Sequence, residues 1–296
     1  MRRTLIVRAV ALALAVLLVG CAGTPKQPPI ERLVVFGDSN VDTGNLFRMT
    51  SDRFPAPPDW RGRNSNGPNV IDYLAKGLGV KVQNYAVSGA TSGLTNVIGL
   101  FPGGKPLEIT GVRWQIDQFI EKDGGKLAPS DLVILWAGSN DLFRIDRKDA
   151  AALTKAIAGV SANINAETDR LYRLGARRIL VANRTPRYVL ENEDNLNGID
   201  LNKAVAVAVA DSAKRTGADV RLVDAYAVVV DIMNSPTRYG FVQVNAICTQ
   251  APACVAEKYD ESLKIANGYV QWDPAGHKTT RVHALMAEKI LGMVKP

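Results

Sequence analysis

The chain has few of the side chains on which metal and cofactor chemistry usually depends. Its 296 residues include only two histidines, His277 and His283, and three cysteines, and aromatic residues make up 6% of it. It contains neither the His-Glu-x-x-His pattern of a zinc-binding helix nor the glycine-lysine motif of a phosphate-binding loop. It also lacks the Gly-x-Ser-x-Gly turn that carries the nucleophile of many hydrolases. Several common hydrolase frameworks are therefore excluded.

The chain is also without a clustered basic region. Lysine and arginine outnumber aspartate and glutamate by 36 to 29, giving a formal net charge of +7, but the charges are interspersed. A nucleic-acid interface would show basic clusters with interleaved aromatic residues. We therefore expect no nucleic-acid partner.

The N-terminal segment has the features of an export signal, and we do not expect it to be part of the fold. Arg2, Arg3 and Arg8 give it a positive start, and residues 9–19 form an uncharged apolar run. This run is too short to span a membrane, so a cleaved secretory signal over residues 1–20 is the better interpretation.

The apolar run ends in Leu18-Val19-Gly20-Cys21, which resembles the lipobox of bacterial lipoproteins. The resemblance implies that Cys21 becomes the lipidated N-terminus and that residues 21–30 form an extended, proline-containing tether. The residue after Cys21 is Ala22 and not an aspartate. By the same resemblance, this implies that the protein is sent to the outer membrane. We expect an exported protein of the cell envelope, anchored by lipid and facing the periplasm or the exterior. An ordinary signal peptide with an incidental cysteine is the alternative.

The two remaining cysteines, Cys248 and Cys254, lie close together in a polar stretch. Disulfides form and persist in the oxidising compartments that exported proteins enter, so we expect the two to be joined. Two free, buried thiols are the alternative.

From residue 31 onward, short apolar runs alternate with longer helical patterns. We predict strands at 33–36, 80–85, 131–137, 178–182 and 220–223, and helices at 69–78, 112–120, 150–174, 202–216, 225–233 and 279–293. Uninterrupted apolar runs suit a parallel sheet that is covered on both faces. The alternation indicates a doubly wound α/β fold, and with no repeat or break in composition a single domain over 31–296 is favoured. Residues 46–69, 93–110 and 234–272 are expected to be irregular.

Polar residues follow the predicted strands at corresponding places. Ser39 follows the first strand, Gly89 the second and Asn140 the third, while Asp273 and His277 precede the last helix. The carboxyl ends of parallel strands share one edge of the sheet, where ligand sites form. We therefore expect these five residues to meet.

A serine hydroxyl needs a base to take its proton, and histidine suits that task near neutral pH. His277 lies in a turn and His283 within a helix, and the turn is the more usual place for a catalytic residue. Asp273 would orient His277 through its second ring nitrogen.

Acyl transfer also requires donors directed at the developing oxyanion. The backbone N–H groups of Ser39 and Gly89 and the side-chain amide of Asn140 are of the right type. Each residue alone has a structural interpretation, such as a turn serine, a turn glycine or a helix cap. Their joint order favours the catalytic interpretation.

Four blocks of sequence resemble those of the SGNH or GDSL hydrolase superfamily, in its lipase/esterase branch. The blocks are Gly37-Asp38-Ser39-Asn40, residues 84–91 with Gly89, Gly138-Ser139-Asn140-Asp141, and residues 272–277. The likeness extends over roughly residues 31–290. It implies a flavodoxin-like, three-layer α/β/α sandwich with a five-stranded parallel sheet.

The resemblance implies a serine ester hydrolase that cleaves acyl esters or lipids through an acyl-enzyme on Ser39, without a metal or organic cofactor. His277 would be the base, Asp273 its orienter, and Ser39, Gly89 and Asn140 the oxyanion hole. An O-acetyl esterase of polysaccharide or peptidoglycan is one alternative. A catalytically silent lipoprotein that binds an envelope component is another.

One departure from the superfamily's pattern concerns the acid and the base. The usual spacing is Asp-x-x-His, whereas Asp273-Pro274-Ala275-Gly276-His277 is one residue longer, and Lys278 stands where proline is usual. Gly276 offers the flexibility to absorb the extra residue. The alternative is a misplaced Asp273, with His277 hydrogen-bonded to a backbone carbonyl.

Overall fold

A computed structural model describes residues 27–98, 107–143, 145–146, 148–187, 193–255 and 265–295. The predicted signal segment and the lipidation site at Cys21 lie outside the described residues. Within the described part, no helix is both long and apolar enough to cross a membrane.

Five parallel strands form the central sheet, in the order β2-β1-β3-β4-β5. They are β1 (Arg32–Gly37), β2 (Lys81–Asn84), β3 (Asp131–Trp136), β4 (Arg178–Ala182) and β5 (Asp219–Val223). This is the flavodoxin-like strand order. The predicted fold class is thus confirmed, and each strand lies within a residue or two of its predicted place.

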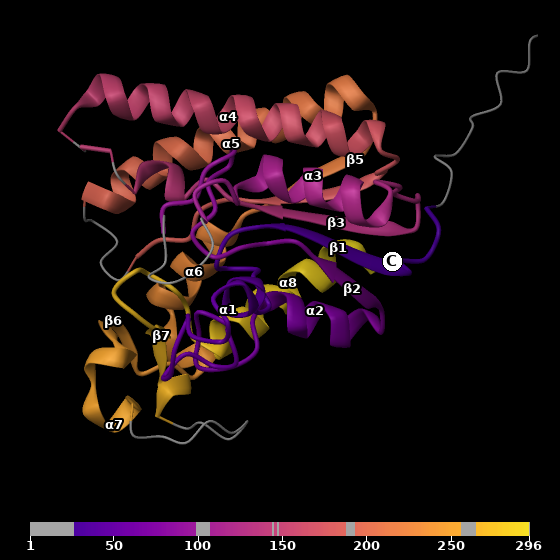
Figure 1. Ribbon diagram of the computed structural model, residues 1–296. Helices are drawn as coiled ribbons and strands as arrows, with labels where there is room; N and C mark the ends of the chain where they lie inside the picture. The colour runs from indigo at the N-terminus through magenta and orange to yellow at the C-terminus, as the bar shows by residue number, and fades with distance from the viewer. Residues whose placement is uncertain are drawn as a thin grey trace, which may run out of the picture.

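Helices cover both faces of the sheet (Figure 1). One face carries α2 (Val70–Leu78), α6 (Ala225–Asn234) and α8 (Thr280–Val294), and the other carries α3 (Val112–Asp123), α4 (Ala150–Arg173) and α5 (Glu193–Thr216). Successive residues of a strand point to opposite faces. In β1, Leu33 and Val35 accordingly enter the first core, and Val34 and Phe36 the second.

The stretches predicted to be irregular contain short elements. Helix α1 (Asn45–Met49) follows the loop after β1, and β6 (Gln243–Ile247) pairs in parallel with β7 (Tyr269–Gln271) in a second, two-stranded sheet. Helix α7 (Pro252–Val255) and 3-10 turns lie between these two strands. The strands of the second sheet contain no long apolar run, and they are separated by more than twenty residues of sequence. The sequence pattern therefore did not predict them.

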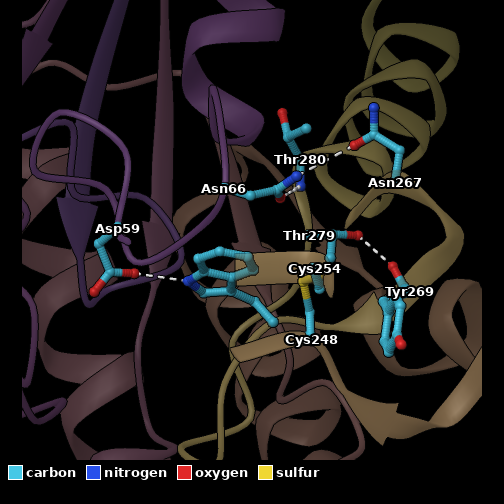
Figure 2. The surroundings of a disulfide bond; sticks show 9 residues. Asp59, Asn66, Cys248, Cys254, Asn267, Tyr269, Thr279 and Thr280 are labelled. Carbon is cyan, nitrogen blue, oxygen red and sulfur yellow. Dashed lines mark hydrogen bonds between the residues drawn. A yellow bond between two sulfur atoms is a disulfide. The ribbon is translucent and has the colours of Figure 1, made fainter. Parts of the chain in front are cut away.

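A disulfide joins Cys248 and Cys254, whose Cα atoms are 5.5 Å apart (Figure 2). Both cysteines are buried in a small cluster with Ala266 and Trp272. Trp272 directly precedes the Asp273–His277 turn, so the disulfide supports the segment that carries the acid and the base.

Candidate active site

The loop that carries Ser39 begins with an abrupt exit from β1 at Gly37. A Cβ atom on Gly37, whose φ is +150°, would lie 2.1 Å from the carbonyl oxygen of Trp136, so only glycine fits there. The buried side chain of Gln115 accepts the Gly37 N–H at 2.8 Å and donates to the Gly37 carbonyl at 2.9 Å. The backbone of Gly37, two residues before Ser39, is therefore held at both its N–H and its carbonyl.

Ser39, His277 and Asp273 form one chain of hydrogen bonds. The Oγ atom of Ser39 lies 2.7 Å from Nε2 of His277, and Nδ1 of His277 lies 2.5 Å from Oδ2 of Asp273. The backbone N–H of His277 also donates to Oδ1 of Asp273, at 3.1 Å. Both carboxylate oxygens of Asp273 thus bind His277. The extra residue in the sequence between Asp273 and His277 does not keep their side chains apart.

A compact turn absorbs the extra residue. The N–H of Gly276 donates to the carbonyl of Asp273 at 3.1 Å, and Gly276 has a φ of +94°, which suits glycine. At the neck of the turn, the N–H of Trp272 donates to the carbonyl of His277 at 2.8 Å. The turn is thereby closed at its base while Asp273 reaches the imidazole.

The electrostatics of the pair favour a basic imidazole. Burial disfavours the charged form of His277, but the charge and hydrogen bond of Asp273 outweigh it and hold the pKa of His277 above its ordinary value. Burial would likewise raise the pKa of Asp273, but His277 holds that pKa below the usual 3.8. Asp273 thus stays ionised and stabilises an imidazolium.

Two further carboxylates, Asp38 and Asp59, are buried near His277. Burial raises the pKa of each to about 6. Hydrogen bonds oppose the shift in both: Asn40 donates to Asp38, and the indole of Trp272 donates to Asp59 at 2.7 Å (Figure 2). Their negative charges help to raise the pKa of His277. Neither carboxylate was predicted from the sequence to act on the base, and Asp59 lies in a proline-rich stretch without a motif.

Gly89 and Asn140, the other two predicted oxyanion-hole residues, line the same pocket as Ser39. Gly89 follows β2 with a φ of +83°, and Asn140 begins the 3-10 turn after β3, where its amide donates to the carbonyl of Ala90 at 2.9 Å. No acceptor among the described residues engages the backbone N–H of Ser39 or of Gly89. Both N–H groups are therefore available to a bound oxyanion.

Asp42 ties the nucleophile loop to the loop that carries Gly89. Its buried carboxylate accepts the N–H groups of Gly44 and Asn45, after β1, and both the N–H and the hydroxyl of Ser88. The carboxylate thus fixes the spacing between the two loops.

These residues line a pocket of about 300 Å³ that contains Ser39, Gly89, Asn140 and His277 on its wall. The larger apolar side chains in its lining are those of Phe54, Val97, Ile98 and Phe143. The volume is in the usual range of small-molecule sites. The site thus places a serine hydroxyl, an imidazole and hydrogen-bond donors beside a largely apolar space.

Two arginines also line the pocket, on the loop after β4. They are Arg184 and Arg187. The side-chain amide of Asn202, in α5, binds both the backbone N–H and the carbonyl of Arg184. The amide of Asn195, also in α5, binds the same two groups of Arg187. Sequence reasoning missed this loop because α5 begins at Glu193 and not at the predicted residue 202.

The second histidine lies elsewhere. His283 is buried in α8, and burial lowers its pKa to about 3, with a smaller contribution from the nearby Lys278. Within the described part of the chain, His277 and not His283 is hydrogen-bonded to Ser39, so His277 lies where a base would act. Among the described residues, no group of three or more histidine, cysteine or acidic side chains is arranged to hold a metal.

A serine, a histidine and an aspartate hydrogen-bonded in this order form the arrangement known as a catalytic triad. A family model described as GDSL-like Lipase/Acylhydrolase matches residues 33–290. The chain therefore belongs to the GDSL-like lipase/acylhydrolase family, as the sequence blocks indicated.

Known proteins with similar sequences include a hemolysin and an acyltransferase. The chain is 28% identical to the thermolabile hemolysin of Vibrio parahaemolyticus, over 88% of this chain and 63% of that protein. It is 34% identical to a phosphatidylcholine-sterol acyltransferase of Aeromonas hydrophila, over 53% of this chain and 45% of that protein. It thus spans less than two thirds of the length of either relative.

A solved structure of a lipase from a goat rumen metagenome has the same fold. Its TM-score is 0.51 at 12% identity, over 89% of this chain and 97% of that one. At this identity the likeness concerns the fold alone.

Proposed function

We propose that this chain hydrolyses carboxylic esters through an acyl-enzyme on Ser39. The observation that carries the proposal is the unbroken chain of hydrogen bonds from Ser39 through His277 to Asp273. A serine hydroxyl is a weak nucleophile near neutral pH, and a base on one side with an orienting carboxylate behind it is the arrangement that activates it.

In the first half-reaction, Oγ of Ser39 attacks the ester carbonyl while Nε2 of His277 takes the hydroxyl proton. The resulting oxyanion accepts hydrogen bonds from the N–H groups of Ser39 and Gly89 and from the amide of Asn140. The C–O bond to the alcohol then breaks, and His277 returns its proton to the departing alkoxide.

In the second half-reaction, His277 takes a proton from a water molecule, which attacks the Ser39 ester. The oxyanion forms again and collapses, and the carboxylic acid leaves as Oγ regains its proton. Asp273 remains ionised throughout and stabilises the imidazolium, in keeping with its lowered pKa.

The pocket supports substrates with an apolar acyl part. Apolar side chains line it, among them the rings of Phe54 and Phe143. The name of one relative, a phosphatidylcholine-sterol acyltransferase, supports lipid esters as a substrate class. We therefore propose acyl esters, lipids included, as substrates.

A panel of p-nitrophenyl esters with rising acyl chain length tests the proposal. We expect the wild type to hydrolyse esters longer than acetate and Ser39→Ala to be inactive on every member. Hydrolysis that survives in Ser39→Ala would refute the mechanism. Activity on acetate alone would favour an O-acetyl esterase, and no activity on any ester would favour a binding protein.

We further propose that the chain is exported and anchored by lipid at Cys21, after removal of residues 1–20, with residues 21–30 as a tether to the envelope. The lipobox-like sequence supports this, and a disulfide between Cys248 and Cys254 suits an oxidising compartment. Expression of the full chain in a bacterial host with labelled palmitate tests it. Label and detergent-phase partitioning are expected for the wild type and absent for Cys21→Ala; equal behaviour of the two would refute the anchor.

A further inference from the structure

Lys278, the residue after His277, is a buried lysine that the proposed mechanism does not use. Its side chain is only 2% exposed. Its ammonium donates to the carbonyl of Gly276 at 2.5 Å and to Oε1 of Gln271 at 3.0 Å. Both acceptors are neutral, and no carboxylate among the described residues forms an ion pair with it.

This arrangement is costly for the fold. Burial, together with the nearby charges of Arg187 and Arg184, lowers the pKa of Lys278 to about 7, while the charge of Asp273 acts in the opposite sense. Removing an ammonium from water is expensive unless a counter-charge binds it, and a well-packed apolar residue of similar size is often the more stable choice. In addition, Nε2 of Gln271 is buried without a partner within the described part of the chain. Stability alone gives no reason for a lysine here.

The two acceptors show what the lysine holds. Gln271 is the last residue of β7, on the entering side of the Asp273–His277 turn, and Gly276 lies on its leaving side. The ammonium therefore bridges the two ends of the turn. It does so beside the bond between the N–H of Trp272 and the carbonyl of His277.

The Gly276–His277 peptide group is held at both of its polar atoms. Its carbonyl accepts from Lys278 at 2.5 Å, and its N–H donates to Asp273 at 3.1 Å. A peptide group is planar, so fixing both atoms fixes the plane from which the Cα atom of His277 projects. Gly276, at a φ of +94°, offers no side chain of its own to restrict that plane.

We propose that Lys278 is a positioning residue for the catalytic base, holding the lengthened turn so that Nε2 of His277 stays on the hydroxyl of Ser39. The inference rests on the proposed function. Without the lysine, the Gly276 carbonyl loses its donor and the plane of the peptide is held by Asp273 alone. The imidazole then spends less of its time within hydrogen-bond reach of Ser39, while the pocket that binds the ester is unchanged.

The variant Lys278→Met tests this, because methionine keeps most of the side-chain volume and removes both hydrogen bonds and the charge. We expect kcat for a p-nitrophenyl ester to fall about 10- to 100-fold with little change in KM, since small displacements of catalytic groups have effects of this size. We expect Tm to hold or rise, because a buried charge is removed. The control is Lys289→Met, at an exposed position of α8, which should match the wild type in both.

The positioning role predicts that Lys278→Met lowers kcat without lowering Tm. A kcat within about twofold of the wild type, or a kcat that falls together with Tm or with loss of folding, would overturn the positioning role. Wild type and Ser39→Ala run in the same assay keep this result apart from the proposed function. An inactive wild type would overturn both proposals, whereas an active wild type with an equally active Lys278→Met overturns only this one.

Discussion

At the scale of single residues, the site depends on how Asp273 holds His277. One carboxylate oxygen of Asp273 binds the imidazole at 2.5 Å and the other binds the backbone N–H at 3.1 Å. Two bonds to one residue restrain both its position and its tautomer. The structure therefore favours full engagement of Asp273 over the alternative in which a backbone carbonyl replaces it.

The variant Asp273→Asn should lower kcat/KM by roughly 1,000-fold or more, because the amide favours the wrong tautomer and cannot stabilise the imidazolium. Asp273 raises the pKa of His277, so without it the base stays neutral to lower pH. The acid limb of the residual kcat/KM profile should therefore move to lower pH. The control Asp200→Asn, on the exposed side of α5, should leave both quantities unchanged. An unmoved acid limb would contradict the assigned pairing.

The sequence alone predicts some of the site's residues but not their supports. Ser39, Gly89 and Asn140 were predictable because each follows an apolar strand, and parallel strands end at one edge. Gln115, Asp59 and Lys278 carry no such signal. Gln115 lies 78 residues from the glycine that it holds, and Asp59 lies 213 residues from its indole donor. Contacts of that range follow from packing and not from local pattern.

At the scale of elements, the segment between β6 and β7 supports the acid-base turn. The N–H of Thr249 donates to the carbonyl of Trp272 at 2.9 Å, and the indole of Trp272 donates to Asp59 at 2.7 Å (Figure 2). The disulfide packs in the same cluster as Trp272. The residue that enters the turn is thus held by the disulfide-bonded segment on one side and by the loop before α2 on the other.

Replacing both cysteines, as Cys248→Ala/Cys254→Ala, should lower the free energy of unfolding of this segment by about 2 kcal/mol, since the disulfide closes a short loop. We also expect kcat to fall several-fold, because the support of Trp272 loosens. Circular dichroism melts and ester hydrolysis measure the two effects. Dithiothreitol should reproduce both in the wild type and change neither in the double variant. A wild type that is indifferent to reduction in both measurements would refute this role of the disulfide.

Elements with strong apolar runs were predictable, and those without them were not. The five strands of the main sheet lie close to their predicted places because buried parallel strands are continuously apolar. Strand β7 has only three residues, and β6 pairs with it across more than twenty residues of sequence. The first turns of α5 are polar because Asn195 and Asn202 bind the neighbouring loop, which hid the true start of the helix.

At the scale of the whole molecule, the sheet separates two cores and gathers the functional loops at one edge. The core beneath β1 and β3 includes α8, whose first turn follows the acid-base turn directly. His283 is buried in this helix, and burial lowers its pKa from 6.5 to about 3. The histidine that the mechanism leaves unused is thus part of the fold's stability.

Because the folded chain keeps His283 neutral, the unfolded chain binds one more proton between about pH 6.5 and pH 3. Stability from this residue is therefore complete above about pH 6.5 and is lost as the pH falls below it. Urea unfolding of His283→Leu should show a shallower loss with falling pH than the wild type, by up to about 1.4 kcal/mol per pH unit. The raised pKa values of Asp38 and Asp59 make the folded chain more stable as the pH falls below 6. This contribution is the same in the wild type and in His283→Leu, so it cancels in the comparison. Parallel pH profiles would contradict the burial of a neutral His283.

The most direct test of the central claim is covalent trapping of the nucleophile. A fluorophosphonate reacts with an activated serine, and peptide mass spectrometry locates the adduct. We predict one adduct per chain, on Ser39, in the wild type and in folded His283→Ala, and none in His277→Ala or Ser39→Ala, because only His277 lies 2.7 Å from Oγ. An adduct on another residue, or undiminished labelling of His277→Ala, would contradict the account of Ser39 as a nucleophile activated by His277.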